Sequence, residues 1–239
     1  MNRYPIRLVN VCLLIVPLSW FVIPLSGCGR APGQPKPDAV IRRPQDQLNF
    51  DTLYQENCAA CHGTDGRNGA AMDLANPEYQ AFVDDPSLRK WISRGMPGTQ
   101  MPAFAVSAGG TLTDKQVDAI VRGMRTRWVS GASGGGRDLP PYMQGQNGNP
   151  MSGRQDYELY CASCHRGSRQ QVTSPTYLAL VSDQALRSII VAGRPDIGHP
   201  DWRNLQPGHP LDSEAVTDMV AYLASLRVPA PGQPYPQNQ

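Results

Sequence analysis

The sequence predicts an all-α protein built from two small helical domains in tandem, and three observations support this fold class. The second half of the chain repeats the first half with an offset of 98 residues. The last segment of each half spaces its apolar residues as one face of a helix does. Segments rich in glycine and proline, in which no helix or strand pattern survives, separate and flank the halves. We therefore expect two compact helical units joined by irregular linkers.

The internal repeat is clearest where proline residues coincide. Residues 76–79 (Asn-Pro-Glu-Tyr) align with residues 174–177 (Ser-Pro-Thr-Tyr), and the alignment continues without a gap to the pairing of Met101 with His199. Because a repeat of this kind fixes architecture, residues at matching positions should have matching places in the two halves.

Each half ends in a predicted helix with an N-capping residue. Thr113 or Asp114 is expected to cap the first of these helices, and Asp212 or Ser213 the second. Apolar residues then recur at helical spacing, at Val117, Ile120, Val121 and Met124 in the first helix and at Val216, Met219, Val220 and Leu223 in the second. These faces predict that both helices are buried against the rest of their own half.

Composition divides the chain into six segments. The first has the basic start and apolar run of a secretory signal, and the others alternate between proline- or glycine-rich stretches and helical patterns. The expected segments are a signal at 1–27, a proline-rich tether at 28–47, a first domain at 48–128, a linker at 129–152, a second domain at 153–228 and a proline-rich tail at 229–239.

Two copies of the pattern Cys-x-x-Cys-His contribute four of the six cysteines. They are Cys58-Ala59-Ala60-Cys61-His62 and Cys161-Ala162-Ser163-Cys164-His165. This spacing is the attachment signature of c-type haem, because two thiols three positions apart can each add to one vinyl group of the porphyrin while the histidine lies against the iron. The sequence therefore predicts two covalently bound haem c groups.

With these motifs and the repeat, the chain resembles tandem class I cytochromes c, the dihaem c-type cytochromes of bacterial respiratory chains. The resemblance covers roughly residues 48–128 and 153–228, and it implies a small helical bundle around each haem. In that family a first helix leads into the attachment motif, and residues 50–57 and 157–160 are the matching segments. Because each domain has only about 80 residues, the haem is expected to complete its core.

The resemblance also implies the axial ligands of the two irons. His62 and Met101 match the ligands of the first iron, with Met101 in the expected Met-Pro context. The second half departs from the family, because His199 stands where a methionine is expected, so His165 and His199 are the expected ligands of the second iron. The family also places a proline carbonyl against the free nitrogen of the first histidine, and Pro77 and Pro175 are the candidates.

Several other side chains compete for the sixth position on each iron. Met72 and Met96 compete with Met101, although Met96 aligns with Arg194, which is no ligand. In the second half His209 competes with His199, and an open sixth site is a third alternative. Neither methionine of this half is a good candidate, because Met151 precedes the motif and Met219 lies on the apolar face of the last helix.

The N-terminal segment predicts export and a lipid anchor. Leu25-Ser26-Gly27-Cys28 resembles the lipobox of bacterial lipoproteins, in which cleavage before the cysteine precedes its lipidation. Cys28 is then the anchor, and Cys12 is removed with the signal. The alternative is that residues 8–25 remain as an anchor helix, although Pro17 and Pro24 argue against it. Both alternatives place the haem-bearing part on the periplasmic face of a cell membrane.

The composition argues for electron transfer and against several other functions. With 22 Lys and Arg against 20 Asp and Glu, no basic block suggests nucleic-acid binding. We find no catalytic triad or phosphate-binding loop, so we expect an electron-transfer protein and not an enzyme. Redox proteins or a respiratory complex are the expected partners, for a mobile carrier or a bound subunit, and a photosynthetic chain is also compatible.

The two ligand sets predict different redox potentials. Methionine favours ferrous iron and a second histidine does not, so electrons are expected to pass from the second haem to the first. Trp202 and Arg203 follow the second ligand loop and are candidates for contacts with haem propionates. A dihaem peroxidase and a haem-based gas sensor are the alternative functions, and each requires an open coordination position on one iron.

Overall fold

The computed structural model describes residues 43–129, 139–143, 148–167 and 172–228. Within these ranges the chain is helical and has no strands, apart from two isolated bridges between single residues. The all-α prediction is therefore confirmed. The predicted signal, the anchor Cys28, most of the tether, parts of the linker and the tail lie outside the described residues. None of the helices in the described ranges is long and apolar enough to cross a membrane.

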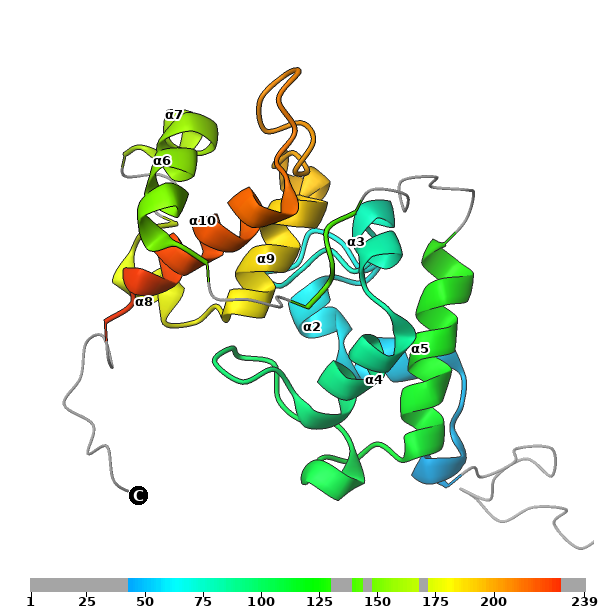
Figure 1. Ribbon diagram of the computed structural model, residues 1–239. Coiled ribbons are helices and arrows are strands. Elements are labelled where there is room, and N and C mark those ends of the chain that lie inside the picture. Colours follow the sequence, from blue (N-terminus) through cyan, green and yellow to red (C-terminus); the bar gives the residue numbers. More distant parts are fainter. Residues whose placement is uncertain (1–42, 130–138, 144–147, 168–171, 229–239) are drawn as a thin grey trace, which may run out of the picture. The chain divides into compact units, whose positions relative to one another are not determined.

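Five α-helices and two 3₁₀ turns form the first half (Figure 1). They are η1 (Pro44–Asp46), α1 (Phe50–Asn57), α2 (Ala59–His62), α3 (Pro77–Phe82), α4 (Asp85–Arg94), η2 (Val106–Ala108) and α5 (Asp114–Trp128). α1 has the bounds that the sequence predicts, and Asn49 caps it by accepting a hydrogen bond from the N–H of Thr52 at 3.0 Å.

The second half repeats this order of helices (Figure 1). Its elements are α6 (Pro150–Tyr160), α7 (Ala162–His165), α8 (Pro175–Leu178), α9 (Asp183–Ala192), η4 (Pro195–Ile197) and α10 (Ser213–Ser225). α6 begins well before the four-residue lead that the sequence predicts. The reason is that Asn149 caps the helix and Pro150 occupies its first turn, where the missing N–H of proline costs no hydrogen bond.

The last helix of each half begins at a capping residue among those predicted. Thr113 forms a capping box with Gln116 at the start of α5, and Asp212 accepts from the N–H of Ala215 at the start of α10. Both helices bury the apolar face that the sequence predicts, since Val117, Ile120, Val216 and Met219 have no exposed surface.

An arginine near the end of each half bonds to the turn between two earlier helices, which are α3 and α4 in the first half and α8 and α9 in the second. Arg125 donates to the carbonyl oxygens of Gln80 and Val83 and pairs with Asp85. Arg227 binds the three positions that lie 98 residues further on, namely the carbonyls of Leu178 and Val181 and the carboxylate of Asp183. The acceptors thus follow the 98-residue register of the sequence repeat, whereas the two arginines are 102 residues apart.

A glycine lies where the first and last helices of each half pack together. A Cβ on Gly123 of α5 would overlap the ring of Phe50 in α1. A Cβ on Gly153 of α6 would overlap the carbonyl oxygen of Asp218 in α10. Each pair of helices therefore approaches to a distance that only glycine permits at that position. This packing fixes the helix that leads into each attachment motif.

The linker segment 139–143 also packs into the fold. Tyr142 is 6 % exposed, and its ring meets the ring of Phe82 edge-on with centroids 5.1 Å apart. The carbonyl of Pro141 accepts a hydrogen bond from Nε of the buried Arg187 in α9 at 2.9 Å. The buried apolar side chains of both halves form one cluster, and the described residues all belong to one compact unit. The division into two domains stays a prediction.

Candidate haem sites

The two attachment motifs have the same local structure. In each motif the first cysteine ends one helix and precedes a short helix of four residues, α2 or α7, that ends at the histidine. The N–H of Cys58 bonds to the carbonyl of Tyr54 at 2.8 Å, and that of Cys161 to the carbonyl of Tyr157 at 2.9 Å. A helical turn places residues three and four apart on one face, so each motif presents both thiols and the histidine together.

The cysteines of both motifs are free thiols that differ in burial. Cys58 and Cys161 are partly buried, whereas Cys61 and Cys164 are exposed. Burial raises the pKa of Cys58 and of Cys161 to about 12 in each case. These thiols therefore stay protonated at neutral pH. The first cysteine of each motif packs against the buried apolar cluster, and the second lies at the surface.

His62 has the orientation that an iron ligand requires. Its Nδ1 lies 2.8 Å from the carbonyl oxygen of Met72. Because a carbonyl only accepts hydrogen bonds, Nδ1 carries the proton and the lone pair of Nε2 is left for a metal. Burial lowers the pKa of this imidazole, which favours the neutral form that binds metals.

The carbonyl that orients His62 belongs to Met72 and not to Pro77. Pro77 instead begins α3, with Asn76 as the capping residue. The matching residue of the second half, Pro175, begins α8 in the same way. The proline that both halves share is thus a first-turn residue of a helix, a position that suits its fixed φ and its missing N–H.

The loops that carry Met101 and His199 have the same backbone pairing. The N–H of Met96 bonds to the carbonyl of Met101 at 3.1 Å, and the N–H of Arg194 bonds to the carbonyl of His199 at 3.0 Å. Gly95 and Gly193 both have positive φ near 70° and leave no room for a Cβ beside the loop that follows. Met101 is partly buried and packs against the core.

The structure brings the imidazole rings of His165 and His199 close together. Their ring centroids are 6.0 Å apart and the rings are inclined by 41°. An imidazole nitrogen lies about 2.0 Å from a bound metal and about 1.1 Å from its ring centroid, so two imidazoles on opposite sides of one metal have centroids about 6.2 Å apart. The observed separation fits two ligands on opposite sides of one iron.

The surroundings of His199 also fit a haem ligand. Its Nδ1 is buried and has no hydrogen-bond partner among the described residues. Burial lowers the pKa of His199, and the neighbouring His165 lowers it further. A neutral, partly buried imidazole beside a second one, at the spacing of a shared metal, is a donor set that suits low-spin iron.

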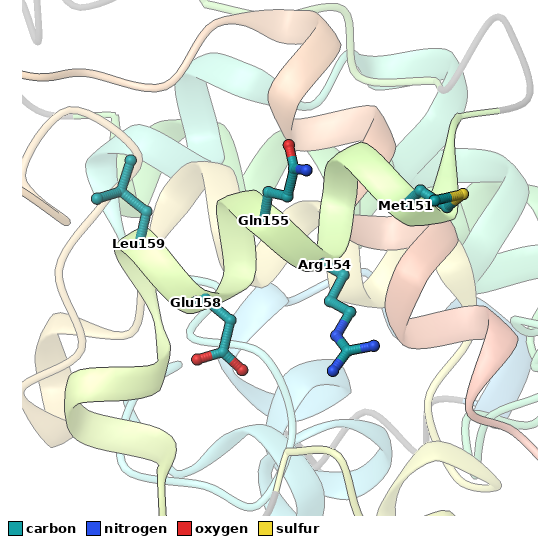
Figure 2. A pocket seen from close by; sticks show the side chains of 5 residues that line it. All are labelled: Met151, Arg154, Gln155, Glu158 and Leu159. Atoms are coloured by element: carbon teal, nitrogen blue, oxygen red, sulfur yellow. The ribbon is translucent and has the colours of Figure 1, made fainter.

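The competing ligands of the second half lie elsewhere. His209 is exposed. Met151 is 78 % exposed at the outer face of α6, where it lines a shallow surface pocket that contains no predicted ligand (Figure 2). Met219 is fully buried, and its sulfur lies 3.4 Å from the sulfur of Cys161. Met219 therefore packs beside the attachment thiol, as its place on the apolar helix face suggests.

Trp202 and Arg203 differ in whether their side-chain N–H groups already have a partner. Trp202 is buried, and its Nε1 has no partner among the described residues, so this N–H is free for a propionate. Arg203 is already paired with Glu78 of α3 at 2.7 Å. The described part of the chain has no cluster of three or more His, Cys, Asp or Glu that would hold a separate metal ion.

Sequence reasoning missed the buried ion pair between Arg194 and Asp196. Their side chains are 8 % and 1 % exposed, and they form two contacts of 2.8 Å. The repeat alignment pairs Arg194 with Met96, and that departure from the first half was the one available signal. Arg194 is charged where the matching residue of the first half is apolar, and this difference indicates a contact that the first half does not make.

Comparisons with known proteins agree with the haem motifs. Residues 46–122 match the family described as cytochrome C oxidase, cbb3-type, subunit III. The chain is 29% identical over 146 residues to the cbb3-type cytochrome c oxidase subunit CcoP of Azospirillum sp. (strain B510), a match that covers 54% of this chain and 44% of the relative. It is 38% identical over 71 residues to the dihydro-heme d1 dehydrogenase of Pseudomonas aeruginosa, which covers 30% of this chain and 13% of the relative.

The chain spans less than half the length of these curated relatives. A solved chain of the Kuenenia stuttgartiensis reducing HAO-like protein complex is also similar, at 16% identity and a TM-score of 0.43, over 75% of this chain and 96% of that chain. The family match over residues 46–122 and the CcoP relative, together with the attachment motifs, support a c-type cytochrome with covalently bound haem c.

Proposed function

We propose that the chain is a dihaem cytochrome c. Cys58 and Cys61 would hold one haem, with His62 and Met101 as axial ligands. Cys161 and Cys164 would hold the other, with His165 and His199 as axial ligands. The observation that carries this proposal is the distance of 6.0 Å between the ring centroids of His165 and His199. His199 lies in a loop whose backbone pairing matches that of the Met101 loop. It supports a second haem beyond the matched residues 46–122.

With both proposed side chains bound, each iron would have no position left for a substrate. Bound haem c would therefore supply outer-sphere, one-electron transfer. The chain's own residues hold the iron in a fixed environment. The histidine pair favours ferric iron and the methionine favours ferrous iron, so we propose that electrons move from the histidine-ligated site toward the methionine-ligated site.

We place this activity at the periplasmic face of the cell membrane, in a respiratory or photosynthetic chain. Cys28 would carry the lipid anchor, and residues 28–47 would act as the tether. The partners would be a redox protein that donates electrons and one that accepts them, or a membrane complex of which the chain is a subunit. The curated relative from Azospirillum, by its name a subunit of a cbb3-type oxidase, supports membership of such a complex.

A redox titration of the purified chain tests this function. We expect a mass that corresponds to two haem adducts and two separate one-electron waves, with the wave of lower potential assigned to the histidine pair. One adduct, one overlapping wave, or turnover of peroxide with loss of an axial histidine would contradict the proposal. The anchor is tested separately, because Cys28→Ala should release the chain from the membrane fraction.

A further inference from the structure

The loop that carries His199 is tied to the loop that follows the first attachment motif. Nη2 of Arg194 donates to the carbonyl oxygen of Gly69 at 2.9 Å. The backbone N–H of Asn68 donates to Oδ2 of Asp196, also at 2.9 Å. Each member of the buried pair therefore bonds both within its own loop and to the other half of the chain.

Arg194 contacts the loops of both predicted iron sites. Its backbone is paired with that of His199 in both directions, at 3.0 and 2.9 Å. Its guanidinium reaches Gly69, whose backbone lies against the attachment motif, since a Cβ on Gly69 would come within 2.6 Å of the nitrogen of Gly63, next to His62.

Other contacts hold the two halves in the same place. Asn76 caps α3 through its Oδ1, and its Nδ2 donates to the carbonyl of Ala192 at the end of α9 at 2.7 Å. Asp73 is 2 % exposed; burial raises the pKa of its carboxyl, and the charge of Asp196 raises it further. The ion pair is thus part of a buried polar seam and not an isolated surface contact.

We propose that Arg194 and Asp196 form an electrostatic clamp that ties the axial-ligand loop of one haem to the attachment loop of the other and sets the redox potentials of both irons. The inference rests on the proposed dihaem function. Arg194 and Asp196 are positioning residues in this proposal, because neither is an iron ligand. Their two opposite charges largely offset each other while the pair is intact.

The sign of each perturbation follows from charge. Oxidised haem carries one more positive charge than reduced haem, so a nearby cation raises the potential and a nearby anion lowers it. Arg194→Gln would leave the Asp196 carboxylate unpaired and should lower both potentials. Asp196→Asn would leave the guanidinium unpaired and should raise both. In a water-excluded site such effects are screened less than at the surface.

The test is a potentiometric titration of the full chain with both haems bound, at pH 8 so that the carboxylates are ionised. We expect both waves to move down in Arg194→Gln and up in Asp196→Asn. Arg194→Lys keeps the charge and should leave both waves near their wild-type positions. Paramagnetic resonance of each variant reports whether the axial ligands are retained. Because loss of one partner of a buried pair destabilises a fold, Arg194→Lys also keeps the proposal testable if Arg194→Gln does not accumulate.

Arg227→Gln is the matched control. Arg227 makes bonds of the same kind, to two carbonyls and one carboxylate, at a corner that carries no predicted ligand. This variant should lose stability without moving either wave. A shift of the same direction in both pair variants, or a shift of one wave alone, would overturn the clamp while the wild-type chain still gives two waves. A wild-type chain with one haem adduct would overturn the proposed function, and the clamp with it.

Discussion

Replacement of Gly153 by alanine probes the helix packing that supports the second attachment motif. Gly153 of α6 faces α10, and a Cβ there would overlap the carbonyl oxygen of Asp218 and lie 2.8 Å from the nitrogen of Met219. Both atoms belong to the backbone, so neither can move away by changing a rotamer. α6 and α10 would have to separate, which loosens the core around the fully buried Met219.

Two opposing effects determine how much Gly153→Ala changes the free energy of unfolding. Alanine favours a helix over glycine by about 0.5–1 kcal/mol, because glycine loses more backbone entropy on folding. Overpacking of a tight contact costs about 1–3 kcal/mol, and a backbone-to-backbone clash belongs near the upper end of that range. We therefore expect Gly153→Ala to lower the free energy of unfolding by about 2 kcal/mol.

Urea unfolding of the haem-loaded chain, followed by far-ultraviolet circular dichroism, measures this change. Gln155→Ala is the control, because Gln155 is exposed on the same helix and its replacement should change the free energy by no more than about 0.5 kcal/mol. If Gly153→Ala proves as stable as the control variant or more so, the close packing of α6 on α10 is refuted.

Three further predictions concern the irons and the alkaline limit of the fold. His199→Ala should convert one of two low-spin iron signals to high spin in the paramagnetic resonance spectrum, whereas His209→Ala should leave both signals unchanged. Met101→His should lower the potential of the first haem by a fraction of the roughly 0.8 V that axial ligands span, and an unmoved wave in a redox titration would argue against Met101 as a ligand. Burial raises the pKa of Tyr79 well above its ordinary value. Stability should therefore fall as pH rises above about 10, and Tyr79→Phe should fall less steeply by up to about 1.4 kcal/mol per pH unit in urea titrations.

Much of the fold could be predicted from local sequence patterns. Capping depends on a side chain and the next few backbone N–H groups, so Thr113 and Asp212 were among the caps predicted from sequence alone. The 98-residue register also held in three dimensions. It relates the acceptors of Arg125 to those of Arg227, and the backbone pairing at Met101 to that at His199.

The remaining features depend on contacts between distant residues. Pro150 suggests a linker when it follows several glycines, but Asn149 before it makes it a helix start, and only the packing of α6 on α10 decides between the two. The carbonyl of Met72 contacts His62 because an irregular loop brings the two residues together. Such a loop has no periodic sequence pattern from which its course could be predicted. The bonds of Arg194 to Gly69 and of Asp196 to Asn68 join residues more than 120 positions apart, so no local pattern could reveal them.

The axial ligands of the oxidised chain test the central claim most directly. Paramagnetic resonance and absorption spectra of the full chain, recorded on a sample whose mass gives the number of haem adducts, distinguish a histidine and methionine pair from two histidines. The account predicts two haem adducts and two low-spin irons, one with each ligand set. One adduct, two identical irons, or a high-spin signal from an iron that lacks a sixth ligand would contradict it.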